Sequence, residues 1–117
     1  MTIGWKLGSD CRAMLLTDLP PHYPRTIADH VTLAVAGNSA PAFAGAARII
    51  GRADDGEGVE AFVVEINGST ARPDGGTWHI TWSLAEGRTA RESNDVIAAQ
   101  GWDSVTERWL DLVPALW

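Results

Sequence analysis

The chain has 117 residues, which fits a single domain over residues 1–117, and its 45% hydrophobic and 21% charged residues are typical of globular proteins. The net charge of −6 argues against non-specific binding to long nucleic-acid duplexes such as DNA, because that binding needs a basic surface. No apolar run is long enough for a membrane span, and Met1–Leu7 lacks the features of a secretory signal. The single cysteine excludes an internal disulfide, so we expect a cytoplasmic protein.

The first part of the chain predicts a strand, a helix and a loop. Thr2–Leu7 reads as a strand, and the apolar residues within Cys11–Leu19 have the spacing of one helical face. Two prolines end this helix and begin the stiff loop Pro20–Pro24. Tyr23 in this loop either stacks on a nucleotide base or anchors the loop.

The middle of the chain predicts a β-hairpin. Its strands are Ala46–Arg52 and Val59–Ile66, and the segment between them, Ala53–Gly58, is rich in aspartate and glycine. Thr89 and Glu92 have the spacing of a capping box and predict a short helix that ends at residue 100.

The C-terminal part, Val105–Val113, reads as one final strand that Pro114 closes. Together these elements predict an α+β fold with a mostly antiparallel sheet and one or two helices on one side.

Two stretches of the chain repeat each other. Residues 30–35 read His-Val-Thr-Leu-Ala-Val, and residues 79–84 read His-Ile-Thr-Trp-Ser-Leu. Both follow the order His, apolar, Thr, apolar, small, apolar, which is typical of a β-strand. We interpret them as two strands that carry one shared site.

The repeat places a histidine and a threonine on the same face of each strand, because side chains two residues apart point the same way. His30 then lies beside Thr32, and His79 lies beside Thr81. Two histidines near a phosphodiester suit general acid and base catalysis, since the histidine pKa lies near neutral pH. The threonine hydroxyls suit hydrogen bonding to the non-bridging oxygens.

This arrangement predicts catalysis without a metal or another cofactor. Asp29 precedes His30, but on a strand it would point to the opposite face. Only His30 and His79 then remain as ligands, fewer than the three of a typical catalytic zinc site.

Several further residues have two interpretations. Arg88 and Arg91 either meet a phosphate or are solvated charges at a helix start, and Trp78 is a candidate for the rim of the site. Ser93 and Asn94 are expected to act as helix caps, because serine and asparagine are favoured there.

The paired His-apolar-Thr motifs resemble those of the 2H phosphoesterases, in particular the small cyclic phosphodiesterase domains of RNA-repair and tRNA ligase proteins. This resemblance implies a bilobal α+β fold and metal-independent opening of a 2′,3′-cyclic phosphate on an RNA end or a small cyclic nucleotide. His30 and His79 would be the acid and base, and Thr32 and Thr81 would bind the phosphate. An RNA ligase is a candidate partner, and we expect a monomer.

Three alternatives stay open. One is an enzyme for another cyclic phosphate, such as an ADP-ribose derivative, or a ligase-like reversal. Another is a module that binds a nucleotide or RNA end without turnover. The third is a structural domain in which both histidines are buried and satisfied.

Overall fold

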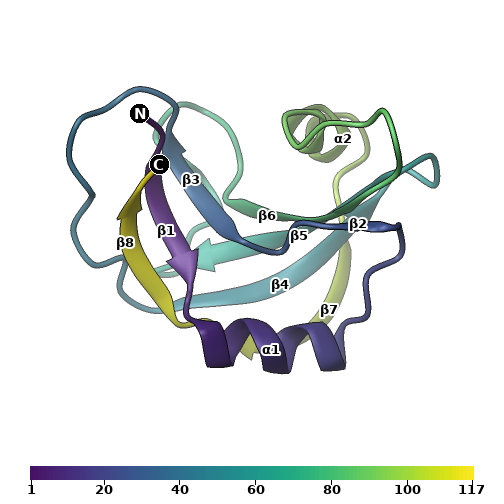
Figure 1. Ribbon diagram of the computed structural model, residues 1–117, viewed down its shortest axis with the longest axis horizontal. Helices are drawn as coiled ribbons and strands as arrows, with labels where there is room; N and C mark the ends of the chain where they lie inside the picture. Colours follow the sequence, from purple (N-terminus) through teal and green to yellow (C-terminus); the bar gives the residue numbers. More distant parts are fainter.

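Two antiparallel sheets and two helices make up the structure, a computed structural model that describes residues 1–117 (Figure 1). The elements in chain order are β1 (Ile3–Leu7), α1 (Ser9–Asp18), β2 (Arg25–Thr26), β3 (His30–Ala34), β4 (Ala47–Asp54), β5 (Val59–Ile66), β6 (His79–Leu84), α2 (Glu92–Gln100), β7 (Asp103–Trp109) and β8 (Leu112–Leu116). The predicted α+β class and the antiparallel β4–β5 hairpin are confirmed.

The larger sheet has the strand order β2-β6-β5-β4-β7, and the two helices cover its opposite faces (Figure 1). Strand β5 is apolar along most of its length, and its successive side chains point to opposite faces of the sheet. Both faces therefore present apolar side chains that a helix covers. Phe62 packs in the same cluster as Leu15 of α1, whereas Val63 packs with Val96 and Ile97 of α2. The expectation that helices lie on one side only was therefore wrong.

The smaller sheet has the order β3-β1-β8, with β1 in the centre. Trp5 of β1 and Val31 of β3 are buried in the core cluster shared with α1. Gly4 is required at the crossing of β1 and β3, since a Cβ there would lie 2.2 Å from the Val31 carbonyl oxygen. This tight approach holds the first motif strand firmly on β1.

The predicted single strand over residues 105–113 is wrong. β7 ends at Trp109 and belongs to the larger sheet, whereas β8 begins at Leu112 and belongs to the smaller one. Pro114 does not close a strand but lies within β8, opposite Trp5. Proline is tolerated there because β8 is an edge strand.

The two sheets are joined where the chain leaves β2, which pairs with β6, and enters β3. The backbone N–H groups of Ile27 and Ala28 donate to carbonyl oxygens of β6, at Trp82 (2.9 Å) and Thr81 (3.0 Å). Ala28 then adopts a positive φ of 43°, which turns the chain away from β6. Arg12 of α1 donates to the Ala28 carbonyl at 2.7 Å. This hydrogen bond ties the segment at which the two sheets diverge to helix α1.

Helix α2 begins differently from the predicted capping box. The Glu92 carboxylate accepts a hydrogen bond from the Thr89 backbone N–H at 2.6 Å, but no side chain caps the first turn. Neither α1 nor α2 is long and apolar enough to cross a membrane.

Candidate active site

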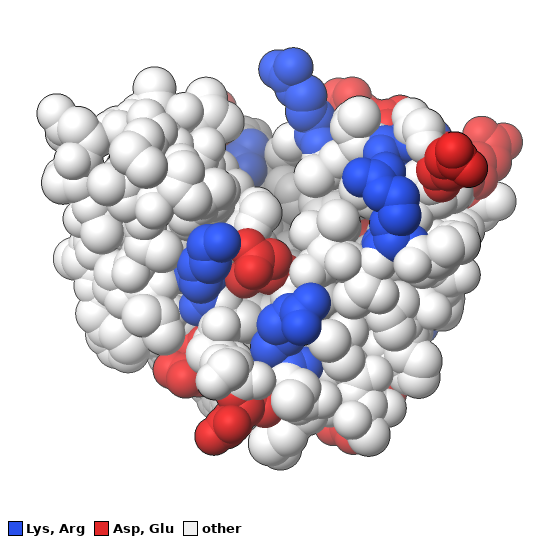
Figure 2. Space-filling model, viewed as in Figure 1, with Lys and Arg blue, Asp and Glu red and all other residues white.

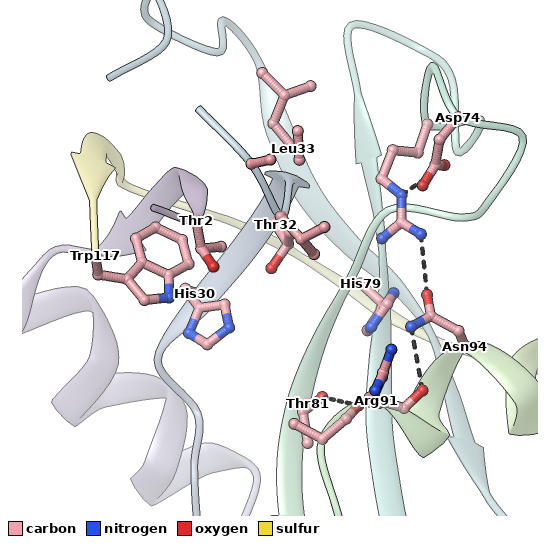
Figure 3. A pocket seen from close by; sticks show the side chains of 15 residues that line it. Thr2, His30, Thr32, Leu33, Asp74, His79, Thr81, Arg91, Asn94 and Trp117 are labelled. Atoms are coloured by element: carbon pink, nitrogen blue, oxygen red, sulfur yellow. Dashed lines mark hydrogen bonds and ion pairs between the residues drawn. The ribbon is translucent and has the colours of Figure 1, made fainter. Parts of the chain in front are cut away.

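The two motif strands line one pocket of about 610 Å³, at the place where the sheets diverge (Figure 3). β3 contributes His30 and Thr32, and β6 contributes His79 and Thr81. The structure thus brings together the four residues that the repeat singled out, although their strands belong to different sheets. The hollow between the two halves is also visible in the space-filling view (Figure 2).

His79 is the more enclosed of the two histidines, at 9% exposure. Its Nδ1–H donates to the Thr77 carbonyl oxygen at 2.8 Å, because a carbonyl can only accept. Burial lowers the pKa of His79 below its usual 6.5; the Thr77 hydrogen bond opposes this, and the positive charges of Arg72 and His30 add to the lowering. A neutral imidazole with a free Nε2 is therefore favoured near pH 7.

His30 has a different partner. Its Nδ1 is 3.0 Å from Oδ2 of Asp29, and the Lys6 ammonium donates to the same carboxylate oxygen at 2.8 Å. Burial alone would raise the pKa of Asp29, but the hydrogen bonds from Lys6 and His30 outweigh it and lower the pKa. The carboxylate is thus ionised and faces the imidazole.

The expected orientation of Asp29 was wrong. Asp29 precedes β3, which begins at His30, and follows the positive-φ residue Ala28. The alternation of faces along a strand therefore does not apply to this pair. Asp29 and His30, which are neighbours in the sequence, therefore form an Asp–His pair.

Trp117 forms a wall of the pocket beside His30. The two ring centroids are 4.6 Å apart, and the Lys6 ammonium lies 5.1 Å from the Trp117 ring centroid. Backbone hydrogen bonds between Trp117 and Thr2, at 2.7 and 2.9 Å, hold this residue in place. Nothing in the sequence distinguishes Trp117 from the other five tryptophans as a pocket residue.

The two threonines are held differently. The Thr81 hydroxyl lies 2.8 Å from the hydroxyl of Ser93, a fully buried residue of α2, and donates to the Ala90 carbonyl at 3.3 Å. Ser93 was expected to cap the helix and instead supports the motif threonine. The Thr32 hydroxyl makes no hydrogen bond within the chain and is free to bind a ligand.

Asn94 of α2 also lines the pocket (Figure 3), as does Arg72, which is hydrogen bonded to it. Arg72 comes from the loop between β5 and β6, and its Nε donates to Asp74 at 2.8 Å. Sequence reasoning missed Arg72, because nothing in the local sequence distinguishes it from a solvated loop arginine. Asn94, expected to cap the helix, accepts a hydrogen bond from Arg72 at 3.0 Å.

Of the two predicted arginines, only Arg91 lines the pocket. Arg88 makes ion pairs with Asp55 at 2.8 Å and with Glu92 at 3.0 Å, so its charge is used to hold the turn before α2. Arg88, predicted as a phosphate-binding residue, is therefore not part of the pocket.

Trp78 and Tyr23 also lie away from the pocket lining. Trp78 is 7% exposed and packs edge-on against Trp5, with ring centroids 5.6 Å apart, so it is a core residue. The Tyr23 hydroxyl donates to Asp54 at 2.5 Å, and burial together with this carboxylate raises the pKa of Tyr23 to about 12. Tyr23 anchors its loop.

One cluster outside the pocket has the residue types of a metal site. His22, Asp54 and Glu60 have ligand atoms within 4.8 Å of one another. His22 Nδ1 already lies 2.7 Å from Asp54, and Arg52 lies 2.9 Å from Glu60. The ligand atoms of the cluster are thus already engaged, by the His22–Asp54 hydrogen bond and by the ion pair with Arg52.

The pocket presents two imidazoles with different partners, three threonine hydroxyls, two guanidinium groups and the Asp74 carboxylate. This set can hold an anion and move a proton on each side of it. No protein-family model, curated protein or solved structure matches this chain.

Proposed function

We propose that this protein is a phosphodiesterase that opens 2′,3′-cyclic phosphates on RNA ends or small nucleotides, with a fold of the 2H phosphoesterase type. The observation that carries the proposal is the convergence of His30, Thr32, His79 and Thr81 on one pocket from two separate sheets. Two histidines on either side of a bound phosphate are sufficient for acid–base catalysis.

The surroundings of the histidines favour different roles. His79 is buried, and its lowered pKa favours the neutral form, so we assign it as the general base. His30 faces the Asp29 carboxylate, which stabilises an imidazolium and fixes its orientation, so we assign it as the general acid.

The reaction then proceeds in one displacement. Nε2 of His79 accepts a proton from water as the water oxygen bonds to phosphorus. The bond from phosphorus to one ribose oxygen breaks, and the imidazolium of His30 gives its proton to that oxygen. His79 afterwards releases its proton to solvent, and His30 takes one up.

The two threonines stabilise the negative charge of the phosphate. Thr32 donates a hydrogen bond to a non-bridging oxygen, where negative charge builds up in the transition state. Thr81 does the same once its hydroxyl turns away from the Ala90 carbonyl, its acceptor at 3.3 Å. Trp117 offers an aromatic face for a nucleobase beside His30.

The test is hydrolysis of the four 2′,3′-cyclic nucleotides and of a short RNA with a cyclic end, in excess chelator. We expect turnover by the wild type and a loss of about 10²- to 10⁴-fold in both His30→Ala and His79→Ala. The matched control is His22→Ala, which removes the one histidine outside the pocket and should retain activity. A wild type inactive on every one of these substrates would contradict the proposal.

A further inference from the structure

The two sides of the pocket differ in chemistry (Figure 3). The side formed by β3, the residues after it and Trp117 is mostly apolar. The opposite side carries Arg72, Arg91 and Asn94, and Lys and Arg side chains border the hollow in the space-filling view (Figure 2). An amphipathic ligand, with a flat apolar part and more than one anionic group, fits this division.

Arg91 is exceptional among the eight arginines of the chain. Each of the other seven donates to a carbonyl or pairs with a carboxylate, whereas the Arg91 guanidinium makes no hydrogen bond or ion pair within the chain. In a chain with a net charge of −6, the one guanidinium that has neither a hydrogen bond nor an ion pair within the chain lies at the pocket.

Arg72 is fixed in place next to it. Its side chain is 10% exposed, and it is held by Asp74 and by Oδ1 of Asn94. Nδ2 of Asn94 in turn donates to the Arg91 carbonyl at 3.2 Å, so one asparagine links the two arginines. A guanidinium has five N–H donors, and Arg72 directs only two of its nitrogens to the protein, which leaves donors for a ligand.

The charges of the pocket exceed what a cyclic phosphate requires. Asp74 pairs with Arg72, and Lys6 pairs with the Asp29 carboxylate beside His30. With His30 protonated, the imidazolium and the Arg91 guanidinium remain. A cyclic phosphodiester carries a single negative charge, so one positive charge has no counterpart in it.

We propose that Arg91 and Arg72 form a second phosphate subsite, so that the substrate is a 2′,3′-cyclic phosphate whose nucleoside carries another phosphate at its 5′ oxygen. The inference rests on the proposed function, which places the cyclic phosphate between the histidines. The 5′ position follows because the cyclic phosphate occupies the 2′ and 3′ oxygens. A pocket of about 610 Å³ has room for one nucleotide.

A 5′ phosphate has two sources, a terminal phosphate on a mononucleotide and the bridging phosphate of an RNA chain. Calorimetric binding separates them without relying on turnover. The probes are adenosine 3′-phosphate, adenosine 3′,5′-bisphosphate and the dinucleotide ApA with a 3′-phosphate, each with its 2′ isomer.

We expect the bisphosphate to bind about tenfold to a hundredfold more tightly than the monophosphate, the usual range for a charged hydrogen-bonded contact. The preference should disappear in Arg91→Gln and persist in Arg108→Gln, whose arginine donates only to the nearby Thr106 carbonyl. If the dinucleotide gains as much affinity over the monophosphate as the bisphosphate does, the subsite belongs to RNA ends. If only the bisphosphate gains affinity, the subsite binds a terminal phosphate.

Equal affinity for the monophosphate and both 5′-phosphorylated probes overturns the subsite, as does no binding of any probe or a preference that survives Arg91→Gln. The outcome is separable from that of the proposed function. Turnover of cyclic nucleotides without the binding preference contradicts the subsite alone, and the preference without turnover contradicts the phosphodiesterase alone.

Discussion

The two halves of the pocket carry the same His-apolar-Thr pattern in different surroundings. β6 lies inside a sheet that helices cover on both faces, and its His79 is buried and bonded to the Thr77 carbonyl. β3 is an edge strand of the smaller sheet, and the side chain of His30 is 25% exposed and bonded to the Asp29 carboxylate. One repeated pattern thus gives two histidines with different partners at Nδ1.

The difference teaches that the motif alone does not define the chemistry of its histidine. A carbonyl oxygen fixes the tautomer and adds no full charge, whereas a carboxylate also stabilises the imidazolium. Burial acts in the same direction, because it disfavours the charged form of His79. In the proposed mechanism, this asymmetry lets a sequence repeat supply both a base and an acid.

Among the variants that distinguish the two halves of the pocket, we expect the largest effects from substitution of the two threonines. Thr81→Val and Thr32→Val should each lower kcat/KM by about 10- to 100-fold, because each removes a hydrogen bond to a charged phosphate. Only Thr81→Val should also lower the free energy of unfolding, by about 1–3 kcal/mol, because the buried Ser93 hydroxyl loses its partner. Steady-state kinetics and urea denaturation measure the two quantities.

Thr32→Val is the matched control for stability, since its hydroxyl has no partner within the chain and valine is favoured in strands. Its free energy of unfolding should stay within about 0.5 kcal/mol of the wild type. Equal destabilisation by the two variants, or full activity in either, would be inconsistent with the difference between the halves.

A smaller effect concerns pH. A base must be neutral, and the pKa of His79 lies below 6.5, so the midpoint of the acidic decline in kcat/KM should lie below pH 6.5. Arg72→Gln removes a positive charge that helps to lower this pKa. The pKa then rises, and the acidic limb should move to higher pH by less than about one unit.

The pH profile of kcat/KM for the wild type and Arg72→Gln provides the measurement, with Arg108→Gln as the variant that keeps the wild-type limb. A wild-type midpoint above 6.5, or a limb that Arg72→Gln moves to lower pH, would argue against His79 as the base.

Much of the fold was predictable because its signals are local. Alternation and β-branched residues mark β3, β4 and β6, and the Asp- and Gly-rich segment between β4 and β5 marks a hairpin. The break between β7 and β8 was missed, because apolar residues continue across it and only the pairing with two different sheets separates the strands.

For the site, the repeat singled out His30, Thr32, His79 and Thr81 correctly as neighbours in space. Arg72 reaches the pocket from a loop, Asn94 from the first turn of α2 and Trp117 from the position after β8, and all three placements depend on tertiary packing. The Asp29–His30 contact depends on the positive φ of Ala28, which is rare for alanine and which sequence patterns do not indicate.

The most direct test of the assigned roles uses 2′,3′-cyclic phosphates in which sulfur replaces one bridging ribose oxygen, at 2′ or at 3′. A thiolate leaves without protonation, so an acid is no longer needed, whereas a base still is. The account predicts that His30→Ala and Asp29→Asn recover to within about tenfold of the wild type on the isomer whose sulfur leaves, and that His79→Ala stays inactive. Recovery of His79→Ala without recovery of His30→Ala would contradict it.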